Sequence, residues 1–208
     1  GALPEILKLC PKAKVVGTAK CKEGLYKHYF PGRGDSTGES SGSRRDTSQT
    51  NSIRGGNWDF QVVKTGDKLN LGKKTLAFIE APMLHWPDSM FTYLERDAIL
   101  FSNDAFGQHY ATSERFDDEV NQEILFEEAA RYYANILLPF GSLVVKKIEE
   151  IQKMDVPIRM IAPSHGLIWR REPMKIVNAY LSWAKNETKS KVVVVYATMW
   201  GSTGKMAR

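Results

Sequence analysis

The sequence is poor in cysteine, contains no long apolar run and shows no leader peptide. Its 208 residues include two cysteines, Cys10 and Cys21, fewer than a secreted disulfide scaffold requires, so we expect reduced thiols in a cytoplasmic protein. No apolar stretch approaches the roughly 20 residues of a membrane helix, so we expect no membrane association. The chain starts Gly1-Ala2-Leu3, without an initiator methionine or the charged and apolar regions of a signal peptide, which favours processing or truncation.

Two common classes of metal site and a nucleic-acid partner are also disfavoured. The sequence has four histidines but neither a C-x-x-C pair nor an H-E-x-x-H motif, which argues against zinc fingers and zincin-type proteases. The net charge of +5 comes from basic residues that are interspersed with acidic ones, so we expect no nucleic acid. A hydrophobic fraction of 42% and a charged fraction of 25% are typical of a soluble globular protein.

Residues 31–57 differ in composition from the rest of the chain. They consist mostly of Gly, Ser, Thr, Arg and Asp, with Ile53 as their single large apolar residue. Such a segment buries too little apolar surface to offset the entropy cost of ordering, so we predict a disordered insertion. The Arg33-Gly34-Asp35 triplet within it is a chance match to an adhesion motif.

The apolar pattern of the remaining residues predicts alternating strands and helices, and hence an α/β fold. A Thr65-Gly66-Asp67 turn between two short strands predicts a hairpin. Pro139 and Gly141 divide a longer helical stretch into two helices. The expected strands are 13–18, 60–64, 68–71, 75–81, 99–102, 158–162 and 192–198, and the expected helices are 3–9, 25–29, two within 117–153, and 173–185.

His85, Asp104 and His165 each come a few residues after an expected strand. Because a sheet holds the ends of its strands rigidly, polar side chains at strand ends suit a metal site. Imidazole and carboxylate ligands favour zinc, iron or manganese. A carboxylate can also bridge two ions through its two oxygens, which a neutral imidazole cannot do. The pattern therefore predicts a metal site formed by these three residues.

Ordinary structural roles remain open as alternatives at all three positions. They are a partly buried structural histidine for His85, a turn former for Asp104 and a turn residue for His165. Glu80 and Asp88 flank His85 and are candidate acceptors for imidazole N–H groups, or ordinary loop charges. His28 and His109 lack the strand-to-loop context, so we interpret both as structural or surface residues.

A second candidate binding site follows the β-branched run at 192–198. The loop at 198–206 (TMWGSTGKM) places glycines and hydroxyls before an expected helix start, where amides and hydroxyls bind phosphate. It is not a Walker loop, because Met199 and Met206 stand where Gly and Ser or Thr are needed. It also lacks the G-x-G-x-x-G of a dinucleotide fold. We expect phosphate binding without a metal, as in FMN-binding flavodoxin-like folds, with a plain turn as the alternative.

Taken together, these residues resemble the flavodiiron (A-type flavoprotein) family. The matching segments occur in the family's order and cover nearly all of the chain outside residues 31–57: GALPEILKLCPKAKV, WDFQVVKTGDKLNLG, EAPMLHWPDSMFTYL, ILFSNDAFGQHYA, RYYANILLPF, IAPSHGLIWR and VVVVYATMWGSTGKMA. The resemblance implies the α/β fold of a metallo-β-lactamase-like αββα sandwich over residues 1–187. Residues 188–208 would be the first strand and phosphate loop of a flavodoxin-like domain.

The resemblance also implies an activity, cofactors and partners. Members reduce dioxygen to water or nitric oxide to nitrous oxide at a non-haem di-iron centre. FMN supplies the electrons, which come from rubredoxin or a similar small donor, and the proteins form head-to-tail homodimers. By position, His85 and His165 would each bind one iron, Asp104 would bridge both, and Trp86 and Tyr133 would lie near the iron pocket. The residues around the FMN phosphate would be Thr198, Met199, Gly201, Ser202 and Thr203.

The sequence also departs from the family pattern. The family's other iron ligands come from an H-x-E-x-D-H motif upstream of the segment that matches Gly1, and these 208 residues do not contain it. This chain by itself is therefore expected to hold neither a competent di-iron centre nor a complete FMN pocket. Two other hypotheses remain: a zinc-dependent hydrolase of the metallo-β-lactamase fold, and a non-catalytic gene fragment.

Overall fold

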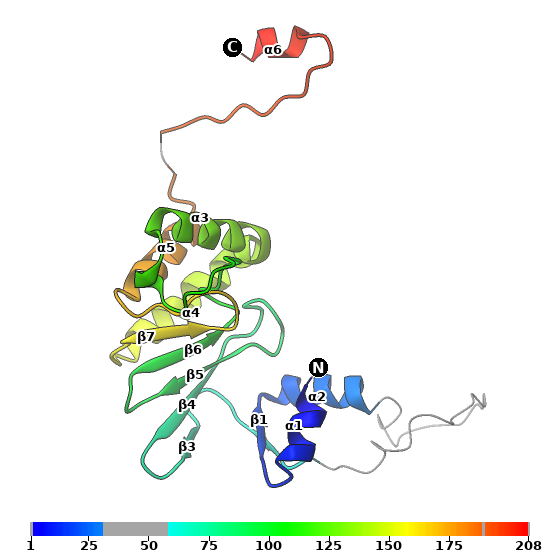
Figure 1. Cartoon of the computed structure of the whole chain (residues 1–208), viewed down its shortest axis with the longest axis vertical. Coiled ribbons are helices and arrows are strands. Elements are labelled where there is room, and N and C mark those ends of the chain that lie inside the picture. Colours follow the sequence, from blue (N-terminus) through cyan, green and yellow to red (C-terminus); the bar gives the residue numbers. More distant parts are fainter. Residues whose placement is uncertain (1, 31–57, 189, 208) are drawn as a thin grey trace, which may run out of the picture.

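The computed structural model of the protein describes residues 2–30, 58–188 and 190–207. The predicted insertion at 31–57 lies outside these residues. The described residues form an α/β fold with a five-stranded sheet, a separate two-stranded sheet and helices beside both (Figure 1). Over these ranges, the structure contains no helix long and apolar enough to span a bilayer.

The order and direction of the strands place three loops at one edge of the larger sheet. Its strands, in spatial order, are β3 (Lys68–Asn70), β4 (Thr75–Glu80), β5 (Met90–Leu94), β6 (Ile99–Asn103) and β7 (Met160–Pro163). β5 pairs antiparallel with both β4 and β6, whereas β7 pairs parallel with β6. β4, β6 and β7 therefore run in the same direction, and the loops that follow them leave the same edge. The apolar pattern of the sequence predicts these three strands but not β5.

Three helices cover one face of this sheet: α3 (Gln122–Tyr132), α4 (Gly141–Lys153) and α5 (Met174–Ala184) (Figure 1). Asn121 caps α3, since its side chain accepts the N–H groups of residues 123 and 124. A π-helical turn (Tyr133–Leu137) and a 3₁₀ turn (Leu138–Phe140) then lead into α4. This confirms the predicted break at Pro139 and Gly141. Buried side chains of the sheet and helices form one core, including Phe91, Leu100, Leu125, Ile148, Ile161 and Ile176.

The smaller sheet corrects one prediction. It consists of β1 (Val15–Gly17) and β2 (Phe60–Val62), which pair parallel, with α1 (Leu3–Leu9) and α2 (Ala19–Tyr29) beside them. The predicted hairpin between 60–64 and 68–71 is wrong, because β2 pairs with β1 and β3 pairs with β4. The expected turn does form: Gly66 has a φ of +92° and the Asp67 carboxylate accepts the Lys64 N–H. That turn carries the chain from one sheet to the other.

The face of the larger sheet opposite α3–α5 bears a row of apolar side chains that is only partly covered. Leu69, Leu76, Leu94, Ile99 and Met160 are direct neighbours across all five strands, and each is partly exposed. In the next row, Phe101 is 43% exposed. An αββα sandwich would cover this face with a second sheet of similar size. Among the described residues, however, the second sheet has two strands.

The predicted strand at 192–198 is not formed. These residues extend away from the folded body, and Val192 and Val195 are 91% and 90% exposed (Figure 1). A strand requires a neighbour for its backbone hydrogen bonds, and no strand of the described structure pairs with this segment. The helix start expected after the loop does form: α6 (Ser202–Met206) follows Gly201, whose φ is +80°.

Candidate metal centre

The loops after β4, β6 and β7 bring His85, Asp104 and His165 together. The Nε2 atom of His85 lies 3.4 Å from Oδ2 of Asp104, and the Nε2 atom of His165 lies 3.3 Å from Oδ1. Asp104 is buried, with 7% of its surface exposed. One buried carboxylate therefore faces a different imidazole with each of its two oxygens, as the sequence pattern suggested.

These separations fit ligands that share a metal ion better than they fit hydrogen bonds. A charge-assisted N–H···O hydrogen bond is about 2.7–2.9 Å long, shorter than both contacts. Two ligand atoms that each lie about 2.1 Å from one ion are about 3.0 Å apart in octahedral geometry and about 3.4 Å apart in tetrahedral geometry. The measured separations of 3.4 and 3.3 Å fall in that range. Nitrogen and carboxylate donors of this kind suit iron, zinc or manganese.

The centre formed by these residues is incomplete as a metal site. Within the ranges that the structure describes, no group of three or more His, Cys, Asp or Glu side chains converges to hold one ion. The three residues instead offer two positions, each with one imidazole nitrogen and one carboxylate oxygen. A closed structural zinc site has four protein ligands, so each position here has room for further ligands.

Strained backbone surrounds His85 and Asp104. Met83, Asn103 and Phe106 have φ values of +66°, +53° and +67°, which cost roughly 1–2 kcal/mol each for residues with a side chain. Local hydrogen bonds hold the His85 loop in place: the Met83 N–H donates to the carbonyl of Trp86, and the Trp86 N–H donates to Ser89 Oγ at 3.1 Å. Such strain is typical of functional sites, where the surrounding structure imposes the conformation.

The Asp104 loop is fixed from both sides. The buried Ser102 hydroxyl donates to the carbonyl of Ala105 at 2.7 Å, which closes the turn around Asp104. Across to the next loop, the Ser164 N–H donates to the carbonyl of Asn103 at 2.6 Å. Because both contacts involve the residues next to Asp104, they fix the backbone that carries its carboxylate.

The segment after His165 is held by a buried carboxylate. Asp117 is 3% exposed, and its Oδ1 accepts the backbone N–H groups of Arg170 and Arg171 at 2.8 and 3.3 Å. The Arg170 guanidinium lies 3.7 Å above the Phe116 ring and pairs with the Asp118 carboxylate. These contacts anchor the chain five residues beyond His165 to the segment that precedes α3.

Aromatic residues border the centre, and they differ in part from those expected. Tyr132 and His109 lie beside His165, with ring centroids 6.4 and 6.0 Å from its imidazole. Burial, together with the negative charge of Asp104, raises the pKa of Tyr132 to about 12. The sequence pattern gives no role to Tyr132 and indicates a structural or surface role for His109. The signal in the sequence is the position of His109, five residues after Asp104 on the same loop.

Two neighbouring residues that sequence analysis singled out have other partners. The Tyr133 ring packs 5.0 Å from the ring of Tyr180 and 5.4 Å from that of Trp183, rather than at the centre. The Glu80 carboxylate accepts the backbone N–H of Thr65 at 3.3 Å, so it supports the turn before β3. Trp86 does lie next to the centre, with its ring centroid 5.4 Å from that of His85 and with 59% of its surface exposed.

The candidate phosphate-binding loop lies apart from the centre. Figure 1 shows the C-terminal segment extended away from the sheet edge, and Met199 is 85% exposed. Of the expected residues, Thr198, Met199 and Gly201 lie in the loop, and Ser202 and Thr203 form the first turn of α6. The structure therefore keeps these residues together in one loop and in the helix turn that follows it.

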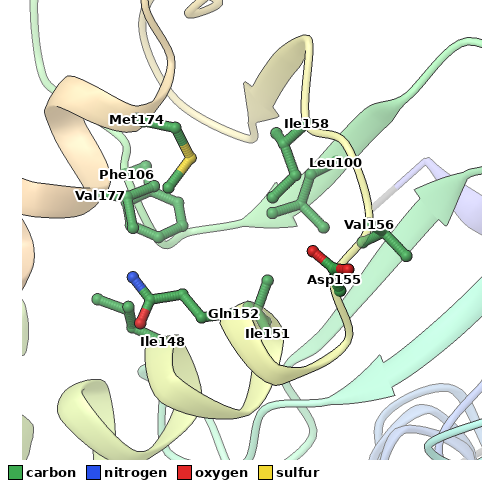
Figure 2. Close-up of a pocket in the computed structure, with 10 residues that line it drawn as sticks. All are labelled: Leu100, Phe106, Ile148, Ile151, Gln152, Asp155, Val156, Ile158, Met174 and Val177. Carbon is green, nitrogen blue, oxygen red and sulfur yellow. The ribbon is translucent and has the colours of Figure 1, made fainter.

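Of the cavities among the described residues, two that lie near the larger sheet are lined by none of the three residues of the centre. One of about 280 Å³ lies between β6, α4 and α5 and is lined mainly by apolar side chains, among them Leu100, Phe106 and Ile151, with Gln152 and Asp155 as its polar residues (Figure 2). The second, of about 320 Å³, borders the His85 loop at Met83 and Pro87. The second cavity thus gives solvent access to the side of that loop.

Comparison with known proteins relates the chain to a described family. A family model described as "ODP family beta lactamase" matches residues 1–166. A nitric oxide reductase of Moorella thermoacetica is 49% identical over 207 residues, which is all of this chain but 46% of that protein. An anaerobic nitric oxide reductase flavorubredoxin of Escherichia coli is 56% identical over 151 residues, 72% of this chain and 32% of that protein.

Solved structures show the same relationship. The rubredoxin oxygen:oxidoreductase of Desulfovibrio gigas superposes with a TM-score of 0.81 at 35% identity, over 99% of this chain and 46% of that one. The flavodiiron protein of Giardia intestinalis gives a TM-score of 0.76 at 36% identity, over 94% of this chain and 42% of that one. The fold is therefore that of the metallo-β-lactamase-like part of such proteins. This chain spans less than half the length of these relatives.

Proposed function

Since the chain belongs to the flavodiiron protein family, through its ODP beta-lactamase domain, we propose that it is part of an oxidoreductase that reduces nitric oxide or dioxygen at two iron ions. The observation that carries this proposal is the Asp104 carboxylate, whose two oxygens face the Nε2 atoms of His85 and His165 at 3.4 and 3.3 Å. A single carboxylate between two imidazoles is suited to bridging a pair of ions.

Each residue of the centre has a separate role in this proposal. His85 and His165 would each bind one ion through Nε2, and Asp104 would offer one oxygen to each. When bound, the iron ions would supply the open positions and part of the electrons for reduction of a small diatomic substrate. Burial of Asp104 limits competition by water for its oxygens. Burial and the Asp104 charge raise the pKa of Tyr132 to about 12, so its hydroxyl keeps its proton to a higher pH than an ordinary tyrosine does.

FMN and an electron donor complete the proposal. We assign the FMN phosphate to Thr198, Met199, Gly201, Ser202 and Thr203, which lie in the loop before α6 and in its first turn. The names of relatives point to a rubredoxin or a similar small donor and to nitric oxide or oxygen as substrate. The phosphate-binding loop lies apart from the metal centre of the same chain. We therefore propose a head-to-tail homodimer, in which the FMN of one subunit donates electrons to the irons of the other. Cysteine usage supports a cytoplasmic location.

The partly covered face of the larger sheet supports a role within a larger domain. A row of five apolar residues crosses the whole sheet on that face without becoming fully buried. Exposed apolar rows of this size are unusual on the solvent-exposed surface of a folded protein and indicate that another element packs against them. We propose that this partner is the second sheet of the αββα sandwich, which also carries the remaining iron ligands.

The experiment that tests the proposal compares two matched carboxylate variants. Asp104→Asn keeps the shape of the side chain but removes its charge, whereas Asp155→Asn makes the same change at the rim of the remote cavity (Figure 2). We expect Asp104→Asn to weaken binding of Fe²⁺ by about tenfold or more at both positions and Asp155→Asn to leave it unchanged. Anaerobic Fe²⁺ titration followed by metal analysis measures this.

The outcomes separate the alternatives. If Asp104→Asn retains the iron affinity of the unchanged protein, the bridging role is wrong. If the protein instead takes up zinc in preference to iron and hydrolyses phosphodiesters or thioesters without flavin, the zinc-dependent hydrolase is correct. The titration is made on the protein together with the sheet that carries the remaining ligands; if that unchanged protein binds neither metal, the non-catalytic fragment is correct.

A further inference from the structure

The buried side chain of Gln108 connects the Asp104 loop to the His165 loop. Gln108 lies four residues after Asp104 and is 1% exposed. Its Nε2 donates to the carbonyl of Leu167 at 3.1 Å, and its Oε1 accepts the N–H of Leu167 at 2.6 Å. The backbone N–H of Gln108 also donates to the carbonyl of His165 at 3.3 Å. Three hydrogen bonds thus join one residue of the first loop to two residues of the second.

The fit around this amide leaves no free space. Gly166, between the two bonded residues, has a φ of +82°, and a Cβ atom there would lie 1.5 Å from Oε1 of Gln108. On the other loop, a Cβ on Gly107 would lie 3.0 Å from the carbonyl oxygen of Asp104 and 3.2 Å from that of His165. The backbones of the two loops therefore approach closely on both sides of the Gln108 amide, which fixes their separation.

His165 depends on this contact more than His85 does. The His165 side chain is 52% exposed, compared with 25% for His85, so packing restrains it less. The His85 loop is closed by its own bonds, including those of Ser89, and makes none of the contacts described for Gln108. Loss of the Gln108 amide should consequently displace one histidine and leave the other in place.

We propose that Gln108 is a positioning residue that holds His165 beside Asp104 and so sets the affinity of one of the two metal positions. It binds no ion itself, because both polar atoms of its amide are occupied by Leu167. Its role rests on the proposed metal centre, but the loop contact on which it depends can be measured without a metal.

The test uses Gln108→Met, which keeps the length of the side chain and removes both polar atoms, and Gln108→Glu, which keeps the acceptor for the Leu167 N–H. The matched control is Tyr93→Phe, which removes another buried side-chain hydrogen bond to a backbone carbonyl, 2.6 Å long, away from the centre. In the metal-free protein, amide hydrogen exchange at residues 164–168 should accelerate in Gln108→Met and stay unchanged in Tyr93→Phe, with residues 82–89 unaffected in both.

Zn²⁺ titration, followed by NMR of the His85 and His165 imidazoles, gives the second measurement. We expect the response of His165 in Gln108→Met to need about 10–100-fold more Zn²⁺ while that of His85 is unchanged, with a smaller shift in Gln108→Glu. Equal loss at both histidines, or no loss at His165, overturns the proposal. If Gln108→Met does not fold, Gln108→Glu decides by the same criteria. If the unchanged protein, tested together with the sheet that carries the remaining ligands, binds no Zn²⁺, the metal centre fails, and hydrogen exchange still decides whether Gln108 holds the His165 loop.

Discussion

Two buried tyrosines make a sharp test of hydrogen bonding in the core, because the same atom can be removed from each. The hydroxyl of Tyr93 donates to the carbonyl of Pro157 at 2.6 Å, and Tyr93 is 4% exposed. Tyr133 is equally buried, at 2%, but its hydroxyl finds no hydrogen-bond partner among the described residues. Substitution by phenylalanine should therefore have opposite effects on stability at the two positions.

The expected magnitudes follow from the contacts. Tyr93→Phe leaves the carbonyl of Pro157 unpaired and should lower the free energy of unfolding by about 1–3 kcal/mol. Tyr133→Phe removes a hydroxyl that is desolvated without compensation and should raise it by about 1–2 kcal/mol. Urea unfolding followed by circular dichroism measures both, provided that the slope with denaturant stays constant. If Tyr133→Phe destabilises the protein as much as Tyr93→Phe does, then the Tyr133 hydroxyl has a partner and this reasoning is wrong.

Two further predictions concern pH and backbone conformation. The pKa of Tyr132 is raised from 10 to about 12, so the folded state holds the hydroxyl proton more tightly than the unfolded state does. The resulting contribution to the free energy of unfolding is complete below pH 10 and is lost as pH rises from 10 to 12, by about 1.4 kcal/mol per pH unit. Urea unfolding across that pH range measures this loss, and Tyr132→Phe should reduce it. Gly166→Ala should lower the free energy of unfolding by more than about 3 kcal/mol, because the new Cβ atom would overlap the Gln108 side chain. Gly66 has a similar φ of +92° but no neighbour within 4 Å, so Gly66→Ala should lower the free energy of unfolding by only about 1–2 kcal/mol. Equal losses of stability in the two variants would show that a Cβ atom at residue 166 does not overlap Gln108.

Much of the local structure, and the positions of the three candidate ligands at strand ends, could be predicted from the sequence. Strong signals with a local cause were correct: the turn at Gly66, the helix break at Pro139 and the apolar runs of β4, β6 and β7. The strand at 192–198 was wrong, since β-branched residues favour a strand but cannot supply its neighbour. The position of Tyr132 beside His165 could not be predicted, because it depends on how α3 packs against the sheet.

The sequence by itself determined which residues follow the strands: His85, Asp104 and His165. Only the tertiary structure decided that they meet, and the reason lies in β5, a strand that the sequence pattern does not predict. Because β5 pairs antiparallel with both β4 and β6, it makes those two strands parallel to each other, and β7 then adds parallel to β6. All three loops therefore leave one edge of the sheet. The residue pattern specifies where each strand ends, but whether a strand runs parallel or antiparallel to another depends on the strands that pair between them.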